Sequence, residues 1–321
     1  MISCTEFIPA YSELFSWLDR NYGYEEVKRF WCYLFEPDGA GIPLINELNQ
    51  QGIKGCFSYW SATLNEEAAD FTLYLNEKAG WFQLQMHACP SKGCLLALEE
   101  KQNYHPYRNY CMHCDCYRYA VEKAGLQYIF NTMGTDQASC SIFIYDPKIF
   151  DGHIALDADT KVMERKASEN EYFHQDFHSS MNMGIEYIGS HYGLEAVKEY
   201  LTSYVKNACV SQIEEIRTGG LSAWKRIIED TYRKEKALEV LDIKLTKDIL
   251  FIELSRCPAI EYLKKTGRNV SCWYRYTTET VMEVIAKETG YSFFLDFYEE
   301  GTGASAYRIH RQEDICQFIS Q

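Results

Sequence analysis

The sequence has no uninterrupted apolar run that approaches the roughly 20 residues a helix needs to cross a bilayer. Its richest apolar stretches, at 94–98 and 249–254, have the length of a strand or a short helix. The first residues lack both a basic start and a long apolar core, so they do not resemble a signal peptide. We therefore expect a cytoplasmic protein that has no membrane partner.

Positive charge is also scarce. The chain has 32 Lys and Arg against 46 Asp and Glu, a net charge of −14. Proteins that bind nucleic acid need a basic face for phosphate contacts, and anionic membranes attract basic segments. The charge balance therefore excludes nucleic acid as an expected partner and disfavours an anionic membrane surface.

A disulfide framework is not expected either. The 321 residues include 13 cysteines, an odd number in a long chain without secretion signals. Thiols in the cytoplasm stay mostly reduced. The cysteines are therefore interpreted as free thiols, metal ligands, a nucleophile or plain core residues. With 46% hydrophobic residues the chain can bury about two ordinary cores.

Three pairs of segments repeat in the same order. The first pair, 18–31 and 188–201, shares the pattern Tyr-Gly-x-Glu-x-Val-Lys. The second pair spans 71–90 and 239–258, and each copy ends in Cys-Pro. A looser third pair begins at Tyr110-Cys and Ser271-Cys. The repeats predict a tandem duplication, with lobe 1 at 1–150, a polar linker at 151–168 and lobe 2 at 169–321.

Each lobe is predicted to be α+β, with packed helices on a small antiparallel sheet. Two such lobes are expected to pack about a pseudo-twofold axis, with a ligand in the cleft between them. Apolar spacing and turn residues give the predicted elements. These are helices over 13–33, 181–205, 112–124 and 277–288, a hairpin of 71–75 with 82–86, helices starting at Pro90 and Pro258, and strands at 127–133 and 139–145.

Part of lobe 1 resembles a known family. Tyr110-Cys-Met-His-Cys-Asp-Cys, then Gly125, then the Gly-rich turn Gly134-Thr-Asp-Gln-Ala-Ser before Cys140 resemble the L-2-amino-thiazoline-4-carboxylic acid hydrolase-like family. The match covers 85–145, with a fainter echo over 255–310. It implies hydrolytic opening of a small sulfur heterocycle but transfers no catalytic residue. Lobe 2 has Ser305-Ala where Cys140 would fall, so only lobe 1 could carry a function that requires that thiol.

The densest group of candidate ligands is Cys111, His113, Cys114 and Cys116. Cys-x-x-Cys spacing at a helix start suits a soft metal or a thiol of low pKa, because helix N-terminal amides stabilise a thiolate. A metal would need further ligands, for which Cys89, Cys94, His87 and His105 are available. The third interpretation is that these residues are neither metal ligands nor reactive thiols.

Cys140 has two interpretations. The Gly-rich turn before it could aim backbone N–H groups at an oxyanion, which suits a nucleophile. The alternative is a strand cysteine that faces the core.

Lobe 2 has a segment of its own with His174, Asp176 and His178. Ser168 and Glu171 fit a capping box, and in a helix after it the two histidines lie i,i+4 on one face, a spacing for a metal site or an acid–base pair. If the segment is extended, all three side chains share one face. The acidic pair at 66–67 is interpreted as a solvated face.

The sequence favours a hydrolase that acts on a C–N bond of a small heterocyclic or amide-like substrate, sulfur-containing ones included, in the cleft between the lobes. Cys111, Cys114 or Cys140 would be nucleophile or ligand. His174, His178 and Asp176 would serve acid–base or ligand roles, and His113 could join a zinc or iron site. The alternatives are a non-catalytic protein that binds a small molecule, tetrapyrrole or metal, and a structural interaction protein. A homo-oligomer is not required.

Overall fold

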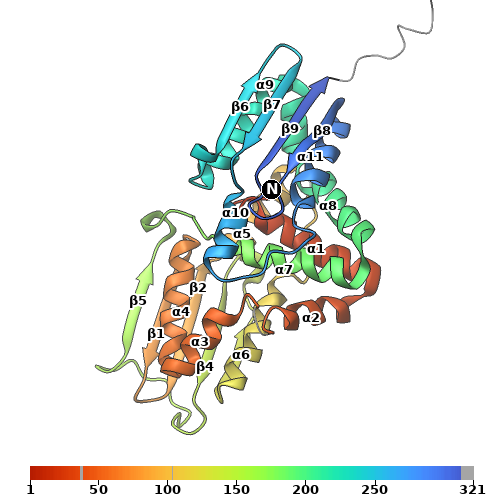
Figure 1. Ribbon diagram of the computed structural model, residues 1–321. Coiled ribbons are helices and arrows are strands. Elements are labelled where there is room, and N and C mark those ends of the chain that lie inside the picture. The colour runs from red at the N-terminus through yellow and green to blue at the C-terminus, as the bar shows by residue number, and fades with distance from the viewer. Residues whose placement is uncertain (37–38, 103, 312–321) are drawn as a thin grey trace, which may run out of the picture. The chain divides into compact units, whose positions relative to one another are not determined.

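The computed structural model describes residues 1–36, 39–102 and 104–311. It confirms an α+β chain with two antiparallel sheets. The chain forms two compact units (Figure 1). The first unit is Leu14–Met183, and the second unit is Met1–Glu13 together with the residues from Gly184 onward. In the described residues, no helix has both the length and the apolar character that crossing a bilayer requires.

The first unit contains a five-stranded sheet in the order β3-β4-β2-β1-β5. All neighbouring strands are antiparallel. The predicted hairpin is confirmed, because β1 pairs with β2 across the turn that ends at Gly80. The strands are β1 (Asp70–Asn76), β2 (Trp81–Ala88), β3 (Gln127–Asn131), β4 (Cys140–Tyr145) and β5 (Lys161–Arg165).

Apolar alternation buries one face of this sheet. Phe71, Leu73 and Leu75 of β1 are all buried, and α4 packs against β1 and β2. Trp60 of α4 stacks on Phe82 of β2 with ring centroids 5.4 Å apart. The helices of this unit are α2 (Tyr24–Tyr33), α3 (Ile42–Gln51), α4 (Ile53–Glu66), α5 (Pro90–Gln102) and α6 (Tyr117–Lys123), with the 3-10 turns η1 (Tyr110–Cys116), η2 (Thr135–Gln137) and η3 (Ala167–Glu169).

The segment predicted as a linker, 151–168, contains a strand. β5 pairs with the outer edge of β1, with Met163 opposite Leu73. The polar composition that suggested a linker reflects the exposed position of an edge strand, whose Val162 is 53% exposed.

The second unit contains a four-stranded sheet in the order β6-β7-β9-β8. Helices α9 and α11 pack on one face of it, where Leu250, Ile252 and Tyr307 are buried (Figure 1). The strands are β6 (Leu241–Leu245), β7 (Ile249–Leu254), β8 (Tyr291–Tyr298) and β9 (Ser305–Arg311). The helices are α8 (Leu194–Ala208), α9 (Val210–Lys234), α10 (Pro258–Lys265) and α11 (Tyr276–Thr289), with the 3-10 turn η4 (Leu238–Val240).

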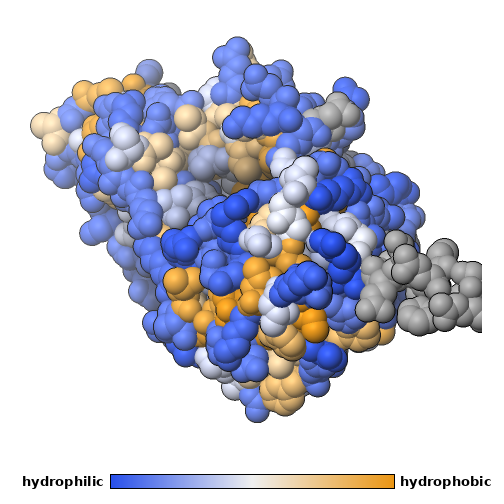
Figure 2. Space-filling model, turned by 90° about the horizontal axis from the view of Figure 1, so that it is seen from above, coloured by the Kyte–Doolittle hydropathy of each residue, from blue (hydrophilic) through white to orange (hydrophobic). Residues whose placement is uncertain are grey.

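The other face of this second sheet carries aromatic side chains. Phe294 and Phe297 of β8 are 44% and 54% exposed. The His310 ring stacks on Phe294 with centroids 4.7 Å apart, and the Arg308 guanidinium lies over the same ring. In the view from above, hydrophobic residues (orange) lie among hydrophilic ones (blue) (Figure 2).

Two predicted helices are each broken by a glycine. The segment predicted as one helix over 13–33 is α1 (Phe7–Tyr22) followed by α2, and 181–205 falls on α7 (Phe177–Tyr192) and α8. Gly23 and Gly193, with φ of 87° and 83°, separate the members of each pair. This backbone conformation suits glycine and ends a helix. The apolar spacing continues on both sides of each glycine, so the spacing alone did not reveal the break.

Other predicted elements are confirmed. Helices α5 and α10 begin at Pro90 and Pro258. The helices before Gly125 and Gly290 end where predicted, and both glycines have positive φ. The strands predicted at 127–133 and 139–145 are β3 and β4.

Candidate functional site

Four cysteines from three separate segments converge in the first unit. Cys89 precedes α5, Cys111 and Cys114 lie in η1, and Cys140 opens β4. Every pair among the four interacts electrostatically, each sulfur raising the pKa of another. All four side chains are half-buried. We call Cys89, Cys111, Cys114 and Cys140 the thiol cluster.

Backbone contacts position Cys89 and Cys140. The N–H of Cys89 donates to the carbonyl of Ala138 at 2.7 Å, which ties the end of β2 to the turn before β4. Cys140 lies opposite Met86 in the pairing of β4 with β2. At the start of α5, the N–H of Lys92 donates to the sulfur of Cys89 at 3.4 Å. Amides at a helix start stabilise negative charge on such a sulfur.

The η1 turn is fixed from β3. The Tyr128 hydroxyl donates to the carbonyl of Cys114 at 2.7 Å. Arg118 donates to the Tyr128 carbonyl at 2.7 Å and also pairs with the Asp115 carboxylate at 2.7 Å. These bonds hold Cys114 in place, because Tyr128 binds its carbonyl and Arg118 binds the side chain of the next residue, Asp115.

His113 is in a defined tautomer. Its Nδ1 lies 2.7 Å from the carbonyl of Tyr110, so Nδ1 must carry the proton and donate. Burial lowers the pKa of His113, which favours the neutral imidazole. Its Nε2 is then an acceptor and lies 3.8 Å from the sulfur of Cys114. In many metal-binding histidines, one ring nitrogen donates to a carbonyl in this way and the other is the metal ligand.

Burial raises the pKa of every thiol in the cluster. The pKa of Cys89 rises to about 12 and that of Cys140 to about 11, while the pKa of Cys114 lies well above its ordinary value. The pKa of Cys111 is also raised by burial, but the positive charge of Lys92 opposes the shift. A metal cation beside these sulfurs would reverse the direction of these shifts. A thiol nucleophile among them stays a prediction.

The thiol cluster is wider than a closed site for a single zinc ion. Among the described residues, no three of these sulfur atoms all lie within 4.8 Å of one another. Zinc–sulfur bonds of about 2.3 Å in a tetrahedron place the sulfurs about 3.8 Å apart.

The histidine segment does not form the predicted helix around His174. Helix α7 begins at Phe177, and Ser168 lies in η3. Asp176 precedes α7 and accepts a hydrogen bond from the Ser179 hydroxyl at 2.8 Å. An acidic side chain at this position stabilises a helix start, which explains why the helix begins after His174. His178 is a buried residue in the first turn of α7.

His174 is buried and paired with an acid. Its Nδ1 lies 2.8 Å from the Glu66 carboxylate. Burial is the largest single effect and lowers the pKa of His174. The hydrogen bond to Glu66 and the charges of Glu67 and Asp176 outweigh it, so the pKa is raised.

The interpretation of residues 66–67 as a solvated face agrees with Glu66, whose side chain is 54% exposed although its carboxylate pairs with His174, and fails for the more buried Glu67. Burial raises the pKa of Glu67, which interacts with both His174 and Cys89. Sequence reasoning missed these two residues because a Glu pair at a helix end has no distinguishing pattern.

The resemblance to the L-2-amino-thiazoline-4-carboxylic acid hydrolase-like family stays a prediction. No family model, no curated protein and no solved structure matches the chain.

Proposed function

We propose that the thiol cluster binds a transition-metal centre through cysteine thiolates. The observation that carries the proposal is the convergence of four thiols from three segments, with a neutral imidazole nitrogen 3.8 Å from the Cys114 sulfur. Thiolates are the preferred ligands of zinc, copper(I) and iron–sulfur clusters. Half-burial leaves the sulfurs reachable while limiting contact with water.

The spacing of the thiol cluster favours an iron–sulfur cluster over a single zinc ion. Four cysteines are the usual ligand set of such clusters, and a polynuclear centre holds its ligands farther apart than one ion does. The N–H of Lys92 at the Cys89 sulfur supplies the kind of hydrogen bond that tunes these centres.

The test is purification without oxygen, followed by iron, sulfide and zinc analysis and an absorption spectrum. We expect near-stoichiometric iron and sulfide in the natural chain and their loss in Cys114→Ser. Cys272→Ser, which alters an exposed thiol of the second unit, is the matched control and should keep them. Stoichiometric zinc without sulfide would replace the iron–sulfur assignment. No metal after anaerobic reconstitution would end the proposal.

A hydrolytic reaction on a small heterocyclic or amide-like substrate is the second candidate. The observation that favours it is that Glu67 interacts with both Cys89 and His174, so an acid–base pair lies beside the thiol cluster. His174 would move the proton and Glu66 would orient its ring. If so, His174→Ala abolishes turnover of a thiazoline or amide substrate while metal content is unchanged. A variant that retains full turnover would remove His174 from the reaction.

We further propose that the two sheets descend from a tandem duplication. Strands β1-β2-β4-β3 follow the same order as β6-β7-β9-β8. Gly52 between α3 and α4 has φ 57° and ψ −136°, and Gly220 inside α9 has φ 66° and ψ −153°. The N–H of Cys257 donates to the Thr302 carbonyl at 2.8 Å, as the N–H of Cys89 does to Ala138. An experimental structure of the full chain tests the duplication. Superposition of the two sheets should bring the helices of one unit onto those of the other, and helices that do not superpose would contradict it.

A further inference from the structure

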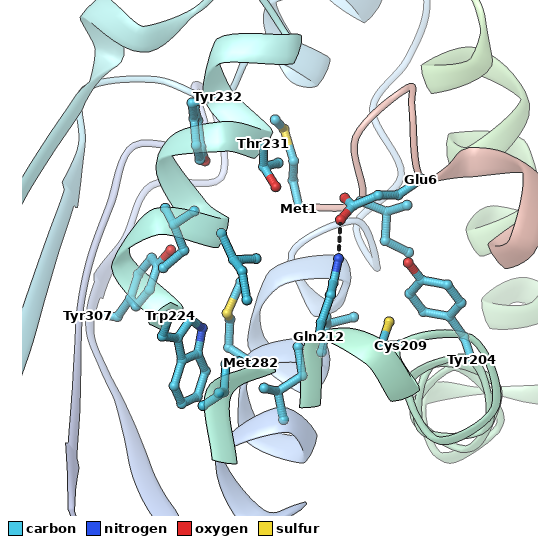
Figure 3. Close-up of a pocket in the computed structure, with 16 residues that line it drawn as sticks. Met1, Glu6, Tyr204, Cys209, Gln212, Trp224, Thr231, Tyr232, Met282 and Tyr307 are labelled. Atoms are coloured by element: carbon cyan, nitrogen blue, oxygen red, sulfur yellow. Dashed lines mark hydrogen bonds between the residues drawn. The ribbon is translucent and has the colours of Figure 1, made fainter. Parts of the chain in front are cut away.

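An open cleft in the first unit differs from the enclosed pocket of the second unit. The pocket between α9, α11 and β9 (Figure 3) has only about 40 Å³ of space, which suits a few water molecules. At its polar end, Glu6 already accepts a hydrogen bond from the Gln212 side chain at 2.9 Å. The cleft of the first unit offers about 420 Å³, within the roughly 300–1,000 Å³ of sites that hold small molecules.

The cleft has two walls, which are one face of α1 and the loop that precedes η1. All residues that line it belong to the first unit. They are Ser16, Asp19 and Arg20 of α1 and Pro106, Tyr107 and Arg108 of the loop. Residues three and four apart lie on one face of a helix, so α1 presents a hydroxyl, a carboxylate and a guanidinium side by side.

Tyr107 fixes the loop against α1. Its hydroxyl donates to Oδ2 of Asp19 at 2.9 Å, and its ring centroid lies 5.9 Å from that of Phe15. Its carbonyl accepts from the N–H of Tyr110 at 3.0 Å, which ties the loop to η1. Because the Tyr107 side chain is buried, these contacts anchor the residue that precedes Arg108.

The cleft is a positive site on an acidic chain. Most arginines of the described residues pair with a carboxylate, as Arg118 does with Asp115. The exposed Arg108 has no such partner among the described residues. Arg20 adds a second guanidinium and Asp19 one carboxylate, so the lining carries a net positive charge although the chain carries −14.

Two guanidinium groups on different walls suit an anion with several oxygens. A guanidinium donates a planar fork of N–H groups to phosphate or carboxylate. A phosphate monoester has three acceptor oxygens and up to two negative charges, whereas a carboxylate has two oxygens and one charge. Phosphate can therefore engage both arginines and a hydroxyl at once. The cleft is open to solvent, so charge and hydrogen bonds rather than apolar burial would select its ligand.

We propose that this cleft binds a phosphate group, held by Arg20, Arg108 and the hydroxyl of Ser16. Asp19 opposes the anion, and its structural part is to anchor Tyr107. The group can belong to a small organic phosphate or be the free ion, and the two share this chemistry. The proposal does not depend on the metal centre proposed for the thiol cluster.

The test is calorimetric titration of the full chain with inorganic phosphate, phenyl phosphate and benzoate, at low salt and about pH 8, where phosphate monoesters carry nearly two charges. We expect both phosphates to bind at least about fivefold more tightly than benzoate, because they carry more charge. Tighter binding of phenyl phosphate would identify an organic phosphate as the ligand, and tighter binding of inorganic phosphate the free ion. Benzoate binding as tightly as both, or no binding of any probe, would overturn the proposal.

Three variants locate the site. Arg108→Gln should weaken binding of both phosphates at least about fivefold, because a charge-assisted hydrogen bond is lost. Arg108→Lys keeps the charge without the fork and should weaken it less. Asp19→Asn keeps an acceptor for the Tyr107 hydroxyl and removes a negative charge, so it should tighten binding.

The control is Arg226→Gln, which alters an exposed arginine of α9 in the second unit and should leave both affinities unchanged. Equal weakening in Arg226→Gln and Arg108→Gln would show a general attraction between anions and basic side chains. Unchanged affinity in folded Arg108→Gln would place the binding elsewhere. Either result would reject this cleft.

Discussion

The backbone N–H of Cys89 donates a hydrogen bond of 2.7 Å to the carbonyl of Ala138. This bond joins the residue before α5 to the turn that leads into β4, so two thiols that are far apart in sequence, Cys89 and Cys140, are placed by main-chain contacts. The turn itself depends on Gly134, whose φ is +91°.

Replacing Gly134 by alanine should destabilise the first unit. A Cβ at this position would lie 2.2 Å from the Ser139 hydroxyl oxygen, and the positive φ adds backbone strain. We expect the free energy of unfolding to fall by about 1–3 kcal/mol, measured by urea denaturation. The matched control is Gly93→Ala in α5, where no atom lies within 4 Å of the added Cβ. That change should stabilise by about 0.5–1 kcal/mol, and equal effects of the two substitutions would contradict the strain argument.

Trp60→Ala should be among the costliest core substitutions. Trp60 is 3% exposed and stacks on Phe82 between α4 and the sheet. Loss of a buried indole leaves a cavity and costs about 3–5 kcal/mol of unfolding free energy. Met133→Ala, at an 81% exposed residue of the same unit, should change it by no more than about 0.5 kcal/mol. A small effect at Trp60 would show that α4 is not anchored there.

The ion pair of His174 with Glu66 should make stability depend on pH. The pKa of His174 is raised in the folded chain, since the hydrogen bond and nearby carboxylates outweigh burial. The stabilisation is therefore fully present below the ordinary pKa of about 6.5 and is lost as the pH rises through the folded pKa.

Glu66→Gln should then lower the unfolding free energy more at pH 6 than at pH 9, and it should lower the His174 pKa measured by NMR titration. Glu100→Gln, an exposed residue of α5, serves as the control and should leave the His174 pKa unchanged. An unchanged pKa in Glu66→Gln would show that this pair does not form in solution.

A metal in the thiol cluster should protect its cysteines from alkylation. Loaded protein should react slowly with iodoacetamide at Cys111 and Cys114, and removal of the metal should speed the reaction at both. The exposed Cys32 and Cys272 report the general reactivity of the reagent and should react alike in both states. Mass spectrometry of the modified peptides measures each site, and equal labelling of Cys114 with and without metal would argue against its being a ligand.

The parts of the fold that were predicted depend on short-range rules. Pro90 and Pro258 mark helix starts because proline is favoured in the first helical turn, and the alternation from Phe71 to Leu75 marks a half-buried strand. Such signals need only neighbouring residues. The same rules predicted a helix over 112–124, but α6 begins only at Tyr117, and Cys111 and Cys114 lie in the 3-10 turn η1 before it.

The parts that were missed depend on distant residues. β5 is polar and becomes a strand only because the edge of β1 is available to it. The helix predicted around His174 instead begins at Phe177, next to the carboxylate of Asp176, while His174 turns to Glu66 far away in sequence. Helices α3, α4 and α9 were not predicted at all, because Gly52 and Gly220 interrupt the apolar spacing.

The two sheets share a strand order but differ at one edge. In the first unit β5 covers the outer side of β1, whereas in the described part of the second unit no strand covers the outer side of β6. An uncovered strand offers its amides and carbonyls to any other chain, which invites aggregation. Lys244 and Asp242 of β6 are exposed and paired at 2.7 Å. Charged side chains therefore disfavour pairing of another chain with the β6 edge, whereas in the first unit β5 covers the corresponding edge of β1.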